Sequence, residues 1–246
     1  MPSSTHDVRP PAAGGARPPA GPLVVAMPQT PGAAPLPYAA EEAELLRAVL
    51  PGSLVLTSPA RDAVLAAMAD APIAHFACHG VSEALDPARS RLLLADHETA
   101  PLTVADLAAA GLSGAELVYL SACSTAQMSV VTLGTVELAQ PARTELPQLA
   151  ALVGRLNRGR DLLDEAITLA AAFQAIGVRH VVGTLWEIDD AITLELADAF
   201  YQGLRTENGA LDLGRSAQAL HHAVRAVRDR LPRTPSLWAP YLHAGA

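Results

Sequence analysis

The sequence predicts a three-layer α/β/α sandwich built around a mostly parallel sheet. Short runs that are apolar throughout alternate along the chain with longer segments that have helical periodicity. Strands that are apolar on both faces are typical of a parallel sheet covered by helices, because both of its faces are buried. Strands that alternate with helices are joined by right-handed crossovers, which keep successive strands in one sheet. The pattern therefore predicts one layered α/β domain.

The expected elements follow one another in a regular order. The first strand ends at Pro28, which cannot donate a backbone hydrogen bond, and turn residues follow before the first helix. The predicted strands are residues 23–27, 54–56, 73–78, 116–122 and 180–185, with a short apolar run at 91–95 and a last extended piece at 238–243. The predicted helices are residues 40–50, 61–70, 104–110, 162–176, 192–204 and 214–231.

Composition excludes several classes of protein. The chain of 246 residues has 17 basic against 25 acidic residues and a net charge of −8, so it lacks the clustered positive charge that nucleic-acid binding needs. Hydrophobic residues make up 50% of the chain, enough for a buried core. Its two cysteines have no C-x-x-C spacing, and no phosphate-binding glycine motif is present. We therefore expect reduced thiols and no metal or cofactor.

The N-terminal stretch differs in composition from the rest of the chain. Ten of the 20 prolines precede Tyr38, and residues 1–21 mix Pro, Ala and Gly without apolar periodicity. This composition predicts a disordered leader, followed by one domain over residues 22–246. The start has no secretory signal and no apolar run reaches membrane-spanning length, so we expect a cytoplasmic protein that does not contact a membrane.

Two reactive side chains directly follow predicted strands. His79 follows the strand of residues 73–78, and Cys123 follows the strand of residues 116–122. In an open parallel sheet, functional groups gather beyond the carboxyl ends of the strands, on loops that the sheet supports. If the two strands are neighbours, the imidazole and the thiol lie side by side at one edge of the sheet.

A cysteine and a histidine at this edge have the chemistry of a nucleophile and its base. A thiol attacks a carbonyl as the thiolate, and an adjacent imidazole can take its proton. Gly80 has no side chain, so its N–H can approach a ligand and, with the N–H of Cys123, form an oxyanion hole. The alternative is structural, because a lone cysteine or histidine in such a place is often an ordinary core residue.

Cys78 is the competing thiol. It precedes His79 inside the apolar run and would face the opposite side of the sheet, since side chains alternate along a strand. We therefore do not expect Cys78 to be catalytic. A disulfide between Cys78 and Cys123 is geometrically conceivable, whereas a zinc site on these side chains is disfavoured because adjacent strand residues point apart.

Three segments resemble the CHAT domain, a caspase-like family of cysteine peptidases that is often attached to TPR repeats. They are His75–Gly80 (HFACHG), Tyr119–Thr125 (YLSACST) and Arg179–Asp190 (RHVVGTLWEIDD), and the C-terminal stretch Ala219–Ala246 is similar as well. The segments occur in the family's order with fitting strands between them. The resemblance covers residues 23–246 and leaves only the leader outside.

The resemblance implies a caspase-like fold and a cysteine endopeptidase that acts in signalling or defence. His79 matches the catalytic histidine, Cys123 matches the nucleophile, and Gly80 matches the glycine whose N–H binds the oxyanion. Because such enzymes work without a fixed third acid, we assign no further member of the catalytic group. A TPR-type or other regulatory protein is an expected partner besides the protein substrate.

The segment after the strand of residues 180–185 supplies candidate substrate-binding residues. In distant relatives such as separase, an acid in the corresponding region receives a basic side chain of the substrate. Asp189 and Asp190 are the candidates here, because a carboxylate suits a bidentate contact with arginine. An ordinary helix N-terminus explains the same two acids. Trp186 is a candidate cleft wall, with a place in the core as its alternative.

The sequence departs from the family pattern at residues 127–160, an insertion after the cysteine loop. The insertion predicts either a gate over the cleft or a disturbed site. Two other functions therefore stay open. One is a catalytically silent caspase-like scaffold whose cleft the insertion occludes, and the other is a thiol hydrolase or acyltransferase with the same nucleophile.

Overall fold

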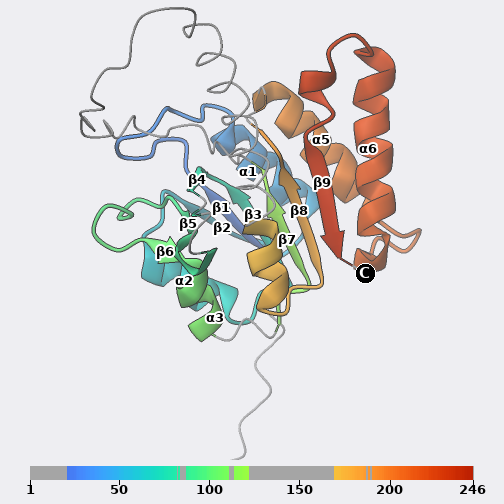
Figure 1. The fold of residues 1–246 in the computed structure, drawn as a ribbon. Coiled ribbons are helices and arrows are strands. Elements are labelled where there is room, and N and C mark those ends of the chain that lie inside the picture. The colour runs from blue at the N-terminus through green and yellow to red at the C-terminus, as the bar shows by residue number, and fades with distance from the viewer. Residues whose placement is uncertain are drawn as a thin grey trace, which may run out of the picture.

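The computed structural model describes residues 21–81, 83, 87–110, 114–121, 169–186, 188 and 190–245 (Figure 1). The predicted leader, apart from Gly21, and the predicted insertion lie outside these residues. A sheet of six strands in the order β2-β1-β3-β7-β8-β9 forms the centre of the domain. Its strands are β1 (Leu23–Ala26), β2 (Leu54–Thr57), β3 (Ile73–Ala77), β7 (Leu117–Leu120), β8 (His180–Thr184) and β9 (Tyr241–Gly245).

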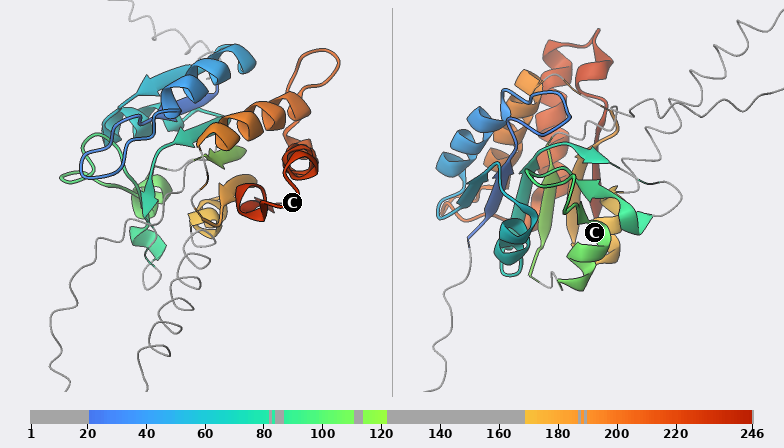
Figure 2. Two further views of the ribbon diagram at one scale, coloured as in Figure 1. Left: turned by 90° about the horizontal axis from the view of Figure 1, so that it is seen from above. Right: turned by 90° about the vertical axis from the view of Figure 1, so that its left-hand side faces the viewer.

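Helices cover both faces of this sheet, so the predicted three-layer sandwich is confirmed. The right-hand view of Figure 2 shows α1 and α3 on opposite sides of the strands. The helices are α1 (Ala39–Val49), α2 (Arg61–Met68), α3 (Val104–Ala109), α5 (Asp190–Leu204) and α6 (Ser216–Arg230), with three short 3₁₀ turns, η1 (Pro87–Arg89), η2 (Leu213–Arg215) and η3 (Pro235–Leu237). A further helix includes residues 169–175.

Side-chain alternation along the strands builds two separate cores. In β3, Ala74 and Phe76 join the core beneath α2, α3 and the helix at 169–175, whereas Ile73 and Ala77 join the core beneath α1, α5 and α6. β7 alternates in the same way. Both faces of these strands are therefore buried, which explains why their sequences are apolar at every position.

Two features of the fold were not predicted from the sequence. A small antiparallel sheet of β4 (Gly80–Val81), β5 (Arg91–Leu92) and β6 (Leu102–Thr103) follows β3 directly. The last strand, β9, pairs with β8 in the antiparallel direction over five residues, Tyr241–Gly245. The other pairs of the central sheet are parallel, so their carboxyl ends meet at one edge.

Of the helices that the structure describes, none combines the length and the apolar character needed to cross a membrane.

Candidate active site

His79 lies immediately beyond the carboxyl end of β3, between β3 and β4, and only 2% of its surface is exposed. Its Nε2 atom is 2.7 Å from the carbonyl oxygen of Ala34. A carbonyl oxygen can only accept a hydrogen bond, so Nε2 carries the hydrogen. In the neutral ring, the other nitrogen, Nδ1, is therefore the one that can take a proton.

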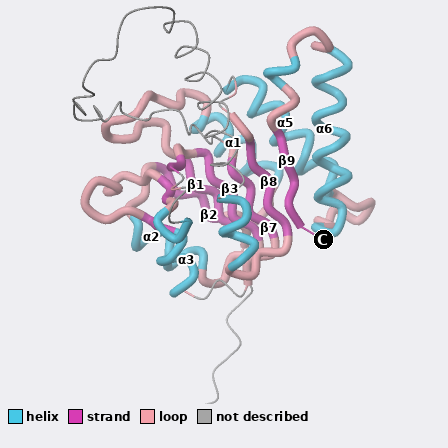
Figure 3. Tube along the Cα trace, in the orientation of Figure 1, coloured by secondary structure: helices cyan, strands magenta, loops and turns pink. Residues whose placement is uncertain are grey.

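Ala34 belongs to the loop between β1 and α1, which crosses the edge of the sheet where the parallel strands end (Figure 3). A second histidine, His97, contacts this loop at the carbonyl oxygen of Pro31, at 2.9 Å. The loop closes on itself as well, because the N–H of Leu36 donates to the carbonyl of Pro28 at 3.0 Å. Local hydrogen bonds thus fix the carbonyl that orients His79.

The strand that leads to Cys123 is the immediate neighbour of β3. β7 pairs with β3 in parallel, with Phe76 opposite Leu120, and the Ser121 N–H continues the ladder by donating to Phe76 at 2.9 Å. Ser121 is the last described residue of the Ser-Ala-Cys segment. The strand ends thus lie side by side, as the predicted dyad requires. Cys123 itself lies outside the described residues, so its role stays a prediction.

Gly80 is buried and opens β4 directly after His79. The N–H of Leu93 donates to the carbonyl of His79 at 2.9 Å, and Gly80 is opposite Leu92 in the antiparallel ladder. Hydrogen-bonded and non-hydrogen-bonded pairs alternate in such a ladder, so the Gly80 N–H is directed away from β5. This direction is compatible with the predicted donor to an oxyanion.

A buried polar cluster lies beneath the ends of β3 and β7, on the side of α1. It consists of Glu42, His75, Ser121 and Tyr201, which we call the Glu42 cluster. The Glu42 Oε1 atom accepts a short hydrogen bond from the Ser121 hydroxyl and lies 3.0 Å from His75 Nε2. The Tyr201 hydroxyl lies 3.1 Å from His75 Nδ1.

The chemistry of its members assigns the hydrogens in this cluster. Burial first, and the charge of Glu42 second, raise the pKa of Tyr201 well above its usual range, so its hydroxyl stays protonated. That hydroxyl donates to His75 Nδ1, and Nε2–H donates to Glu42. The His75 ring also stacks on Tyr119, with centroids 4.8 Å apart. The ring is thus held on both edges and on one face.

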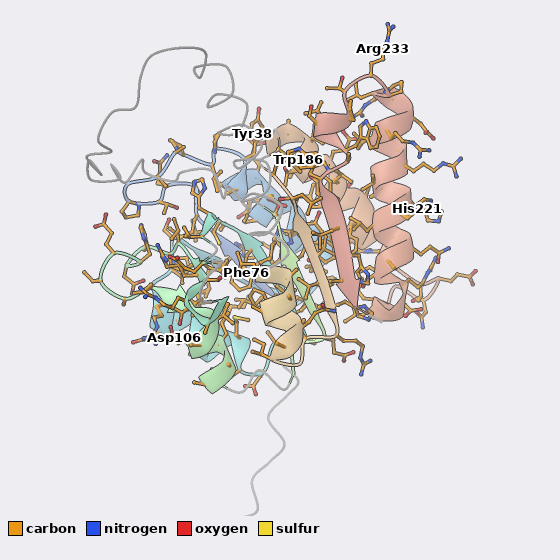
Figure 4. All side chains as sticks on the ribbon, viewed as in Figure 1. Tyr38, Phe76, Asp106, Trp186, His221 and Arg233 are labelled. Atoms are coloured by element: carbon orange, nitrogen blue, oxygen red, sulfur yellow. The ribbon has the colours of Figure 1, made fainter. Side chains whose placement is uncertain are left out.

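The predicted substrate-binding residues are described only in part. Trp186 follows β8 at the same edge of the sheet (Figure 4), where its indole N–H donates to the carbonyl of Ser236 at 3.0 Å. Trp186 is partly exposed and joins neither main core, so the cleft-wall hypothesis remains open. Asp189 lies outside the described residues. Asp190 begins α5, which agrees with the helix-start alternative, and its side chain is not described.

The competing thiol is on the other face of the sheet. Cys78 is 2% exposed and belongs to the core beneath α2 and α3, as the alternation along β3 predicts. No grouping of three or more metal-ligating side chains occurs among the described residues.

Sequence reasoning missed the Glu42 cluster and the carbonyl of Ala34. Glu42 lies four residues before Leu46 and seven before Val49, the spacing of one helix face, so helical periodicity is the signal that this acid faces the core. His75 offered a signal, because a histidine inside an apolar strand needs a buried hydrogen-bond partner. A backbone carbonyl has no sequence signal at all.

Comparisons with known proteins assign the chain to a family. The family model of the CHAT domain matches residues 1–246. A search of the curated proteins finds no match. Among solved structures, the Arg-specific cysteine proteinase gingipain R matches with a TM-score of 0.47 and 9% identity, over 91% of this chain and 45% of that chain. The chain thus spans less than half the length of that proteinase.

Proposed function

The chain belongs to the CHAT domain family, a group of caspase-like cysteine peptidases, and on that premise we propose that it is a cysteine endopeptidase. In this proposal Cys123 is the nucleophile and His79 is its base. The observation that carries the proposal is the hydrogen bond between His79 Nε2 and the carbonyl oxygen of Ala34, at 2.7 Å. This bond orients the imidazole at the strand end next to the one that leads to Cys123.

The proton moves through Nδ1 of His79 in this mechanism. Nδ1 takes the proton from the Cys123 thiol, and the thiolate attacks the carbonyl carbon of the scissile peptide bond. The imidazolium then gives the proton to the leaving amine, and the C–N bond breaks to leave an acyl-enzyme. Water hydrolyses the thioester, and His79 acts as the base again. The Ala34 carbonyl stabilises the imidazolium that forms in each half of the reaction.

The N–H groups of Gly80 and Cys123 bind the oxyanion in this proposal. The Gly80 N–H is directed away from β5, as such a donor requires. A Cβ at this position would lie 3.2 Å from Leu169 Cδ1, so the glycine makes room for the packing of Leu169. Each such donor typically contributes about 10²–10³-fold to the rate.

The substrate is a protein cleaved after a basic residue. Asp189 and Asp190 receive the basic side chain, and Trp186 forms part of the adjacent wall. The enzyme acts in the cytoplasm in a signalling or defence context, with a TPR-type regulatory protein as its partner. Family membership and the place of Trp186 beyond β8 support this part of the proposal.

A library of internally quenched peptides tests the proposed function. We expect the wild-type protein to cleave after Arg or Lys, and we expect both Cys123→Ala and His79→Ala to lower kcat/KM at least about 10³-fold. Cleavage that is equal in the wild type and in Cys123→Ala would reject the peptidase.

The burial of His79 favours a second candidate, a catalytically silent caspase-like scaffold. At 2% exposure the imidazole has almost no surface for a substrate in this conformation. In that candidate, residues 127–160 cover the site permanently. Peptide cleavage by the intact chain and by a variant without these residues distinguishes the two functions: a peptidase is active in the intact chain, whereas a scaffold silenced by the covering segment cleaves only after the deletion.

A further inference from the structure

The Glu42 cluster joins the two strands that carry the proposed catalytic residues. One oxygen atom, Glu42 Oε1, is bonded to His75 within β3 and to Ser121 at the end of β7. His75 precedes His79 by four residues, and Ser121 precedes Cys123 by two. A single carboxylate on α1 therefore contacts both strands close to the points where they deliver the dyad.

This contact lies at the end of the described pairing between β3 and β7. The ladder between β3 and β7 runs from Ile73 opposite Leu117 to Phe76 opposite Leu120, and the Ser121 N–H makes the last bond, to Phe76. The Ser121 hydroxyl thus attaches the described end of β7 to α1, two residues before the proposed nucleophile in the sequence.

Glu42 itself is held firmly enough to serve as an anchor. Glu42 is 4% exposed, and its partners His75 and Ser121 are 0% and 2% exposed. α1 carries Glu42 on its buried face, beside Ala43, Leu46 and Val49. Hydrogen bonds to a charged group are stronger than neutral ones, and burial protects them from competition by water. A buried charge of this kind is costly unless each bond to it is made.

We infer that Glu42 is a positioning residue: its carboxylate holds the end of β7, and the chain that leads to Cys123, in register with β3 and His79. The inference rests on the proposed function for the reaction that it serves. Glu42 does not touch substrate. It limits the movement of the strand end, and a displacement of about 1 Å in such a site can reduce a rate about 100-fold.

The test compares Ser121→Ala with a matched control, Ser216→Ala. Both serines are buried, and each hydroxyl donates one described hydrogen bond, that of Ser216 to the carbonyl of Leu213 at 2.6 Å. Ser216 begins α6, and its described hydrogen bond goes to the turn before that helix and to no member of the Glu42 cluster. Glu42→Gln is a second variant, which keeps an acceptor oxygen but removes the charge. Circular dichroism selects a temperature at which all variants are folded.

Two measurements are made on each variant. The first is hydrogen–deuterium exchange of residues 117–121, which reports whether the end of β7 stays attached. The second is the alkylation rate of Cys123 by iodoacetamide as a function of pH, read peptide by peptide so that Cys78 is separated. We expect Ser121→Ala to speed the exchange and slow the alkylation at neutral pH, each about tenfold, with a smaller effect in Glu42→Gln. Ser216→Ala should change neither.

The outcomes separate this inference from the proposed function. Exchange of residues 117–121 that is the same in Ser121→Ala and Ser216→Ala overturns the inference. Faster exchange with unchanged alkylation also overturns it, because the cluster would then be structural only. If His79→Ala does not slow the alkylation of Cys123, the proposed function fails, and the exchange measurement alone decides whether Glu42 holds the strand end.

Discussion

Replacement of His75 by Phe should destabilise the fold strongly, although the two rings have a similar shape. His75 is 0% exposed, with one nitrogen bonded to Glu42 at 3.0 Å and the other to Tyr201 at 3.1 Å. Phe keeps the stacking on Tyr119. It leaves the Glu42 carboxylate and the Tyr201 hydroxyl without the hydrogen bonds that His75 makes. Each such group costs about 1–3 kcal/mol, and the Glu42 carboxylate is the more expensive of the two. We expect a loss of about 3–5 kcal/mol in the free energy of unfolding.

A second substitution should recover much of this loss. Leu in place of Glu42 removes the buried charge and fills its place beside Leu46 with apolar atoms. Replacing a buried polar pair by apolar residues is often close to neutral, and neutral hydroxyls cost less than a carboxylate, so we expect the double variant His75→Phe/Glu42→Leu to lose only about 2–3 kcal/mol. The remaining cost comes mainly from the hydroxyls of Ser121 and Tyr201, which lose their acceptors.

Urea unfolding of the wild type, both single variants and the double variant measures the coupling. We expect the double variant to be more stable than His75→Phe alone. If the loss in the double variant equals the sum of the losses in the two single variants, Glu42 is not a buried charge that depends on His75. A loss below about 1 kcal/mol in His75→Phe would refute the same assignment.

Two further predictions concern packing and pH. A Cβ on Gly203 would lie 3.0 Å from the Cβ of Ala219, so Gly203→Ala should lower the unfolding free energy by about 1–2 kcal/mol, and Ala219→Gly in the same chain should recover part of it by thermal unfolding. Burial and Arg179 lower the pKa of His180, and burial and His180 lower that of His243. The folded state therefore binds fewer protons than the unfolded state, and stability should be complete above about pH 6.5 and decline as the pH falls below it. In His243→Gln the decline in the urea midpoint between pH 7 and 5 should be smaller, and an unchanged slope would contradict this reasoning.

The parts of the fold that the sequence predicts are those in which periodicity has room to repeat. β1, β3, β7 and β8 are apolar on both faces because both are covered, and their runs stand out against the helical pattern of α6. β4, β5 and β6 have two residues each, too few to show alternation. Their pairing depends on where β3 and α3 place the chain, which is tertiary information.

The candidate site divides in the same way. His79 and Cys123 could be singled out because reactive side chains directly after buried strands are conspicuous, and the pairing of β3 with β7 agrees with that reasoning. The carbonyl of Ala34 has no signal in the sequence, and the helical spacing of Glu42 predicts its burial but not its partners. Both groups belong to segments far away in the sequence: Ala34 is 45 residues from His79, and Glu42 is 79 residues from Ser121. Only the assembled layers bring them together.

The distance between His79 Nδ1 and Cys123 Sγ tests the central claim most directly. A crystal structure of the protein with a peptidyl electrophile bonded to Cys123 would measure it. We expect the two atoms to lie about 3–4 Å apart, with Nε2 still bonded to the carbonyl of Ala34. A sulfur on the far face of β7, or an imidazole turned so that Nδ1 meets the Ala34 carbonyl, would contradict the account.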